Sequence, residues 1–320
     1  MHMQKGEIKT CIELLKEFEQ RDEQPNCAEK LLFENVGGKD VYNITAPFED
    51  EGDLLIAGRV EDRNEEFSEV HFFVQKGGSW VPKKDAPVFQ LQDPFVTRIG
   101  GDIVLGGVQI KPYPHQDSVR QFVWWTVFYR GTCIHNLKKF ADGPLGMKDI
   151  RLIELNDGSI GVFTRPQGQI GGRGRIGFAR IPSLEALNAK TIEEAPLLDN
   201  LFADEEWGGA NEVHVLANGL LGILGHVACF DKTGKRHYYP MIFILNPNTR
   251  ETSNISLVAT RSNFLKGPSK RPDLEDIVFS GGLVRQHNGK VTFFAGTSDT
   301  EAQKITLKDP FVDYEQEAEI

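Results

Sequence analysis

The chain has 320 residues, of which 40% are hydrophobic and 26% are charged, and this balance is that of a globular protein with a sizeable core. Its formal net charge of -10 argues against a nucleic-acid partner, because a phosphate backbone requires a basic surface. The sequence has no signal core, no apolar run of the ~20 residues that a membrane helix needs, and four scattered cysteines, so we expect a cytoplasmic protein with free thiols and no membrane partner.

The first predicted element is a helix near the N-terminus. Apolar residues recur there at helical spacing, with charged residues between them. They are Ile8, Cys11, Ile12, Leu15 and Phe18. We expect this helix to pack on the outside of the domain, with a dimer contact, and hence a homo-oligomer, as the alternative. Residues 1–30 are therefore predicted as an N-terminal helical segment and residues 31–320 as the main domain.

After residue 30, short apolar runs alternate with Gly, Asp, Asn and Pro, which predicts strands separated by turns. Five of these runs share one form, in which a polar turn precedes the strand and a Gly or a charged residue ends it. The five runs span residues 53–58, 102–107, 159–163, 220–225 and 290–296. A polar cluster stands just upstream of each run, at residues 43–45, 92–94, 148–151, 211–214 and 275–280.

Five units of this kind predict an all-β fold, a five-bladed β-propeller with a short N-terminal helix. A β-sandwich is the alternative, but it would not explain a polar cluster before each apolar run. The innermost strands of a propeller converge on its axis, so residues at matching places in each blade are expected to meet in one pocket. The residues expected there are Asp93, Lys148, Arg151, His226 and Asp276.

One stretch, residues 172–177, formally matches the dinucleotide pattern GxGxxG. It enters another strand-like run rather than a helix, and no βαβ pattern surrounds it, so we interpret it as a basic loop between strands, placed to cover the pocket mouth. The sequence has no metal-ligand spacing, P-loop or GxSxG motif. We therefore predict no metal site and no cofactor.

Carboxylate and basic residues are the better candidates for chemistry. Asp93 stands directly before Pro94, where an Asp ordinarily serves a turn. Arg151 and Arg165 flank one predicted strand, with Lys148 adjacent. Surface solvation is the ordinary role of such basic residues. A buried phosphate, however, requires a cluster of Arg with a His, since guanidinium pairs bidentately with phosphate oxygens.

In their order and spacing, these motifs resemble those of the inverting β-mannoside phosphorylases. The resemblance is closest to their relatives, the β-1,2-mannan (mannogen) transferase–phosphorylases of trypanosomatid parasites and some bacteria. It is carried by residues 41–46, 58–63, 91–94, 148–151 with 163–166, 208–214 with 224–226, and 294–300. The resemblance implies a five-bladed propeller with a single catalytic Asp at its axis, and it places that role on Asp93.

The resemblance also implies a phosphate site and a mannose site around Asp93. The residues implied for phosphate are Lys148, Arg151, Arg165, His226 and Tyr239, with Tyr238 as the alternative to Tyr239. The residues implied for the sugar are Asn43, Arg59, Asp149, His214, Asp276 and Asp299.

We therefore expect a glycoside phosphorylase that cleaves β-mannosides, in particular β-1,2-linked manno-oligosaccharides, with inversion. Inorganic phosphate is the expected co-substrate, mannose 1-phosphate the expected product, and Asp93 the expected proton donor to the leaving oxygen. Three alternatives stay open: a GDP-mannose-dependent β-1,2-mannosyltransferase, a non-catalytic sugar-binding propeller, and an inverting hydrolase. The hydrolase needs a second carboxylate to activate water. The candidates for that base are Asp276, Asp299 and Glu212.

Overall fold

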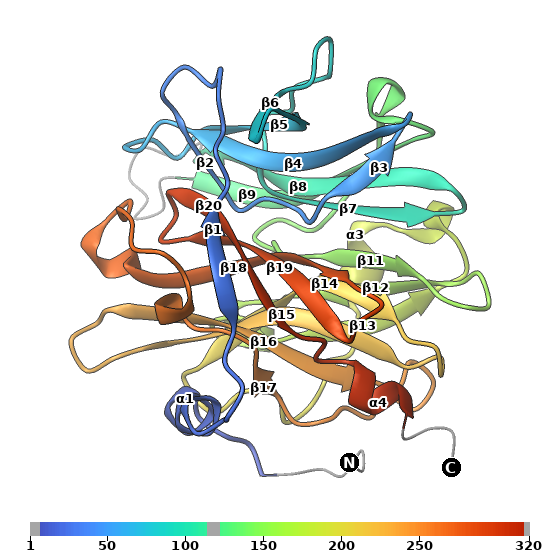
Figure 1. Cartoon of the computed structure of the whole chain (residues 1–320). Coiled ribbons are helices and arrows are strands. Elements are labelled where there is room, and N and C mark those ends of the chain that lie inside the picture. Colours follow the sequence, from blue (N-terminus) through green and yellow to red (C-terminus); the bar gives the residue numbers. More distant parts are fainter. Residues whose placement is uncertain (1–6, 114–121, 317–320) are drawn as a thin grey trace.

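The computed structural model describes residues 7–113 and 122–316, and within them the protein is built mainly from β-strands, as predicted (Figure 1). The helices are short: α1 (Cys11–Glu19), α2 (Gly168–Gly171), α3 (Ala189–Glu193) and α4 (Val312–Gln316). None of the helices in the described ranges is long and apolar enough to cross a membrane.

Strands that follow one another in the sequence pair as antiparallel meanders. The first sheet joins β2 (Asp40–Tyr42), β4 (Asp53–Glu61), β5 (Ser68–Lys76) and β6 (Ser79–Pro82), with β3 (Phe48–Asp50) beside β4. The second joins β7 (Gln92–Ile99), β8 (Asp102–Pro112), β9 (Phe122–Gly131) and β10 (Lys138–Asp142). The third joins β11 (Arg151–Glu154), β12 (Ile160–Thr164) and β13 (Gly177–Ile181).

The remaining strands form one larger sheet made of two further meanders. One contains β14 (Trp207–Val215), β15 (Leu221–Phe230), β16 (Arg236–Leu245) and β17 (Ser256–Leu257). The other contains β18 (Asp276–Arg285), β19 (Lys290–Thr297), β20 (Glu301–Lys308) and β1 (Asn26–Lys30). A short parallel pairing of β16 with β18, at His237 with Asp276, joins the two. The number of blades stays a prediction.

The N-terminal segment contributes both a helix and a strand. Helix α1 begins with a capping box formed by Thr10 and Glu13, and it packs on β15 and β17 through Cys11, Leu14 and Phe18. Residues 26–30, which the sequence analysis assigns to a helical segment, instead form β1, which pairs with β20 although the two lie near opposite ends of the chain (Figure 1). This pairing satisfies backbone groups that an open edge of β20 would leave without partners.

Several polar residues at the inner strand ends adopt left-handed backbone conformations. The φ angles of Asn43, Asp93, Asp149 and Asp299 are 44°, 48°, 59° and 53°. The pairing of β7 with β8 is interrupted at Asp93, between Gln92 and Phe95, and that of β14 with β15 at Asn211. Bulges and left-handed residues re-aim side chains out of the regular pleat, and here they occur where the polar clusters were predicted.

Candidate active site

Most of the polar clusters converge on one cavity of about 190 Å³. Among the residues that line it are Asn43, Arg59, Asp93, Lys148, Asp149, Arg165, His226 and Asp299, all predicted from the sequence as site residues. They come from separate sheets and lie far apart along the chain. The structure therefore brings together most of the residues implied for the sugar and for the phosphate in a single pocket, which we call the Asp93 pocket.

The Asp93 carboxylate is buried and held by two donors. Its Oδ1 accepts hydrogen bonds from Asn43 Nδ2 at 2.8 Å and from Arg59 Nη1 at 3.0 Å. Burial by itself would raise the pKa of Asp93, but the positive charges of Arg59 and Lys148 and the Asn43 hydrogen bond outweigh it and hold this pKa below its ordinary value. Asp93 is therefore ionised at neutral pH in the ligand-free pocket.

Asp299 lies beside Asp93 and behaves in the opposite way. Burial is the largest influence and raises its pKa, and the negative charge of Asp93 adds to that effect. Arg59 and Lys270 oppose the rise without cancelling it. The pocket thus contains two carboxyl groups whose pKa values are displaced in opposite directions, an arrangement typical of sites that transfer protons.

Arg165 is a buried cation of the pocket that is anchored by a backbone oxygen and a carboxylate. Its Nε donates to Gly208 O at 2.8 Å, and its Nη1 lies 3.2 Å from Asp149 Oδ2. Nη1 is nevertheless buried without a hydrogen-bond partner. A Cβ on Gly209 would lie 2.9 Å from Arg165 Cδ, so the glycine at this position lets the strand approach the guanidinium closely. The positive charges around Asp149, that of Arg165 foremost, outweigh its burial and lower its pKa to about 2.

Lys148 is the cation that the pocket leaves unpaired. Over residues 7–113 and 122–316, its ammonium group makes no hydrogen bond or ion pair, although it lines the cavity. The other cations each have a carboxylate partner: Arg59 has Glu61 and Asp93, Lys270 has Glu61 and Glu66, and Arg271 has Glu66 and Asp273. A buried or half-buried cation without a partner is what an anionic ligand would satisfy.

His226 completes this side of the pocket as a neutral ring. Burial lowers its pKa to about 3, with Arg165 and Lys148 acting in the same direction and Asp149 against it. Its Nδ1 lies 2.8 Å from Asn211 Oδ1, so the neutral ring donates there and presents the lone pair of Nε2. The ring stacks on Tyr238 with a centroid distance of 5.4 Å.

Two predicted residues, Tyr239 and Asp276, do not line the Asp93 pocket. Successive side chains of a strand point to opposite faces. On β16 it is Tyr238 that faces the cavity, so Tyr239 points away from it. Tyr239 Oη donates to Asp276 Oδ2 at 3.2 Å, and His237 Nδ1 contacts the same oxygen at 2.6 Å. Of the two tyrosines considered for the phosphate set, Tyr238 therefore lines the pocket and Tyr239 does not.

Arg151 and His214 likewise lie elsewhere, in a second cavity of about 190 Å³. Arg151 Nε donates to Asn211 O at 2.7 Å, and its guanidinium carbon lies 4.8 Å from the centroid of the Phe95 ring. His214 Nε2 contacts Glu212 Oε2 at 2.7 Å. Of the two candidates for the first basic position, Lys148 lines the Asp93 pocket and Arg151 does not, because the intervening left-handed residue Asp149 turns the chain between them.

Several further residues line the rim of the pocket and were not predicted from the sequence as site residues. These are Glu66, Gln92, Arg236, Lys270, Arg271, Leu274, Ile277 and Phe279. The basic pair Lys270–Arg271 stands in a loop before β18, outside the repeated strand pattern. Its only sequence signal is two adjacent basic residues before a Pro.

The GxGxxG-like stretch at residues 172–177 packs beside Arg165. The carbonyl oxygen of Arg173 accepts from Arg165 Nη2 at 3.4 Å, and a Cβ on Gly174 would lie 2.7 Å from Arg165 Nε. Strand β13 starts at Gly177, so the stretch leads into a strand, as expected. Gly174 thus makes room for the guanidinium.

The two adjacent tyrosines provide a matched test of the strand register. Tyr238→Phe should weaken the use of an anionic co-substrate about 2- to 10-fold, because one hydrogen bond contributes about 0.5–1.5 kcal/mol. Tyr239→Phe should leave the kinetics unchanged, since that hydroxyl bonds to Asp276 outside the pocket. Steady-state kinetics of both variants checks this, and an effect confined to Tyr239→Phe would contradict the assignment.

The depressed pKa of His226 makes a prediction for stability. Between its ordinary pKa of 6.5 and its folded value of about 3, the unfolded chain binds a proton and the folded protein does not. The free energy of unfolding should therefore fall as pH drops below about 6.5, by up to about 1.4 kcal/mol per pH unit. Asp149 lowers the free energy of unfolding further only when the pH falls below its ordinary pKa of 3.8.

Urea unfolding from about pH 7 to about pH 4 measures this dependence. The slope should be shallower in His226→Gln than in the wild type. His135→Gln is the control, because the His135 side chain is 35% exposed and lies outside the Asp93 pocket. Equal slopes in the wild type and His226→Gln would contradict a neutral, buried His226.

Comparison with known proteins identifies close structural relatives. The family model described as "Protein of unknown function (DUF1861)" matches residues 17–313. The structure of MPT-4, a mannose phosphorylase from Leishmania mexicana in complex with phosphate ion, has 32% sequence identity, covers 93% of this chain and 92% of that one, and has a TM-score of 0.84. MPT-1, a GDP-Man-dependent mannosyltransferase from the same organism, has 34% identity, 95% coverage of both chains and a TM-score of 0.85.

A more distant structure shares the fold. The β-1,2-mannobiose phosphorylase from Listeria innocua has 14% identity, covers 91% of this chain and 93% of that one, and has a TM-score of 0.58. A search of curated proteins gave no match. The resemblance carried by the sequence motifs is confirmed by these structures.

Proposed function

The chain belongs to the DUF1861 family, with the two Leishmania enzymes among its relatives, and from this premise we propose that it is an inverting β-mannoside phosphorylase acting in the Asp93 pocket. It is an enzyme of the glycoside phosphorylase and glycosyltransferase class. Its substrates in this proposal are β-1,2-linked manno-oligosaccharides and inorganic phosphate. We also propose that its meanders are the five blades of a propeller. A cytoplasmic location and a homo-oligomer stay predictions.

The observation that carries the proposal is a pair of cationic groups in the pocket that have donor capacity left unused. Lys148 has no carboxylate partner, and Arg165 Nη1 is buried without a hydrogen bond. Both lie beside the neutral His226 and the hydroxyl-bearing Tyr238. Two cationic donors and a hydroxyl suit one small anion, and the Nε2 lone pair of His226 can accept from the hydroxyl of hydrogen phosphate, the anion that a phosphorylase requires.

In this proposal, a phosphate oxygen held by Arg165 and Lys148 attacks the anomeric carbon of the mannoside. The new C–O bond forms on the face opposite the glycosidic C–O bond that breaks, and Asp93 delivers a proton to the leaving oxygen, directly or through a sugar hydroxyl. Asp93 is a carboxylate in the free pocket, so it must gain that proton on assembly of the complex. A phosphate anion nearby favours this, because a like charge raises the pKa of a carboxyl group.

The hydrolase alternative finds little support in the pocket. A hydrolytic base has to be an ionised carboxylate facing the sugar. Asp276 and Glu212 do not line the Asp93 pocket. Asp299 does, but its raised pKa works against the basic form. Asp149 lines the pocket as an ionised carboxylate, but it is paired with Arg165, so the pocket suits a reaction whose nucleophile is already an anion.

A GDP-mannose-dependent mannosyltransferase is the second candidate, and the rim of the pocket favours it. Arg236, Lys270 and Arg271 extend the positive charge beyond Arg165, as a diphosphate would require. Lys270 and Arg271 are, however, already paired with carboxylates, and Arg236 Nε lies 3.7 Å from Asp273 Oδ2. A diphosphate would have to compete with these carboxylates for the three cations. The ionised Asp93 would serve this reaction as a base for the acceptor hydroxyl.

Incubation of the protein with β-1,2-mannobiose, with and without phosphate, tests the proposal. We expect mannose 1-phosphate only when phosphate is present. Release of mannose at an equal rate without phosphate would identify a hydrolase. If mannobiose is untouched but an acceptor is elongated from GDP-mannose, the transferase is correct, and the same cations bind its diphosphate. Sugar binding with no turnover in any of these assays would identify a non-catalytic lectin.

A further inference from the structure

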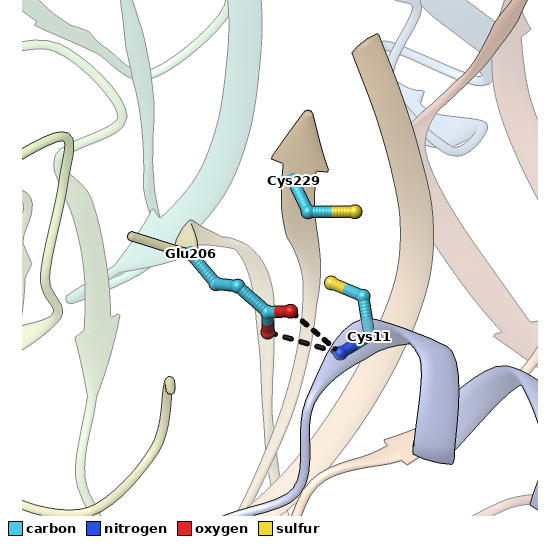
Figure 2. A group of neighbouring side chains, drawn as sticks. All are labelled: Cys11, Glu206 and Cys229. Carbon is cyan, nitrogen blue, oxygen red and sulfur yellow. Dashed lines mark hydrogen bonds between the residues drawn. The ribbon is translucent and has the colours of Figure 1, made fainter. Parts of the chain in front are cut away.

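A second group of chemically reactive side chains lies away from the Asp93 pocket, where helix α1 meets the sheet. Cys11 begins α1, Cys229 lies near the end of β15, and Glu206 stands in the loop just before β14. Figure 2 shows the two sulfur atoms facing each other, with the Glu206 carboxylate beside Cys11. Three segments that are distant in the sequence thus contribute two thiols and a carboxylate to one place.

The donor atoms of this group are close enough to share one ion. The two Sγ atoms and a carboxylate oxygen of Glu206 all lie within 4.8 Å of one another. Sulfur atoms bound tetrahedrally to zinc at about 2.3 Å are separated by about 3.8 Å, so modest side-chain rotations would bring these atoms into place. Cys11 is buried, whereas Cys229 and Glu206 are half-buried and leave a route for an ion to enter.

The surroundings orient the carboxylate in the way that a metal ligand is oriented. The backbone N–H of Cys11 donates to both oxygens of Glu206, at 2.8 and 3.0 Å. Ligating carboxylates are ordinarily held by such outer hydrogen bonds. The nearby imidazole of His237 is engaged by Asp276 at 2.6 Å and by Asp231 at 3.5 Å, so it is not available as a further ligand.

The charges of the group also favour a cation. Its members are three acidic groups whose ligand atoms lie within 4.8 Å of one another. Two thiolates and a carboxylate would therefore repel one another unless a dication lay between them.

We propose that Cys11, Cys229 and Glu206 form a structural binding site for Zn²⁺, with water as the fourth ligand. Binding breaks two S–H bonds and releases two protons while two Zn–S bonds and one Zn–O bond form, with no change in oxidation state. Two thiolates with a carboxylate suit this borderline-soft ion. The ion fastens α1 to β15 and to the loop before β14. No spacing motif in the sequence predicts this site, because its three ligands are far apart in the chain and meet only in the folded protein.

The test uses the full chain, reduced with a phosphine and freed of metal by a chelator. Iodoacetamide labelling, read by peptide mass spectrometry, should be suppressed at Cys229 by added Zn²⁺ and unchanged at the exposed Cys27. Co²⁺ should bind at one equivalent and give thiolate-to-metal charge-transfer absorption. This absorption should be lost in Cys229→Ser and in Cys11→Ser and kept in Cys27→Ser.

Two results would overturn the site. One is unchanged labelling of Cys229 with Zn²⁺ in the wild type, a measurement that requires no variant to fold. The other is Co²⁺ absorption that persists in a correctly folded Cys229→Ser. A Cys11–Cys229 disulfide in the unreduced protein, together with no metal uptake after reduction, would identify a redox-active pair in place of the metal site.

Discussion

Asp93→Asn should reduce turnover of unactivated β-mannosides by about 10²–10⁴-fold, the usual contribution of a positioned proton donor or acceptor. The substituted amide keeps the size of the side chain and still accepts from Asn43 and Arg59, but it can neither gain nor lose the proton that the leaving oxygen requires. Arg59 retains Glu61 as its ion-pair partner, so we expect the fold to persist. Initial rates of mannose 1-phosphate formation measure the loss.

Two further variants make this result specific. Asp276→Asn is the control, because Asp276 was also expected in the site but lies outside the pocket, and its rate should stay close to that of the wild type. Asp299→Asn tests the neighbouring carboxyl group, whose raised pKa makes it the better holder of a proton in the free pocket. A larger loss in Asp299→Asn than in Asp93→Asn would move the proton-transfer role to Asp299.

The sequence predicted the strands and the meeting of the polar clusters because both follow from a repeated pattern. A polar residue before an apolar run becomes an inner strand end in most repeats, and this rule predicts Asp93 and Lys148 as pocket residues. What the pattern does not contain is the direction of a single side chain. Side chains of adjacent strand residues point to opposite faces, so an error of one residue reverses the direction. The sequence pattern therefore does not distinguish Tyr239 from Tyr238, and it is Tyr238 that faces the cavity.

Local backbone geometry explains the other differences. The left-handed conformation of Asp149 separates Lys148 from Arg151, and no residue preference specifies it reliably for an Asp. The rim residues Lys270 and Arg271 come from a loop, where no periodicity exists to be read. The contact of Cys11 with Glu206 depends on how the N-terminal elements pack on the later strands. Strand β1 pairs with β20, and α1 packs on β15 and β17.

Arg165→Lys should raise the phosphate concentration needed for half-maximal rate by about 10- to 100-fold while leaving the mannoside dependence nearly unchanged. Hydrogen bonds to a charged group contribute about 1.5–3 kcal/mol each, and every 1.4 kcal/mol is a tenfold change. Lysine keeps the positive charge beside Asp149 but has no guanidinium fork to bind two phosphate oxygens. Steady-state kinetics with phosphate and mannobiose varied in turn separates the two dependences.

The choice of lysine follows from the buried ion pair. Arg165→Ala would leave Asp149 ionised and unpaired in the interior, at a cost of about 3–5 kcal/mol to the fold, so a loss of phosphate use in that variant could reflect unfolding. The double variant Arg165→Ala/Asp149→Asn removes both charges and should lose phosphate use while remaining folded. Arg180→Ala, on β13 outside the pocket, is the control. An unchanged phosphate dependence in Arg165→Lys and in the double variant would place the anion elsewhere, with the unpaired Lys148 and the rim residues Arg236 and Arg271 as the next positions to test.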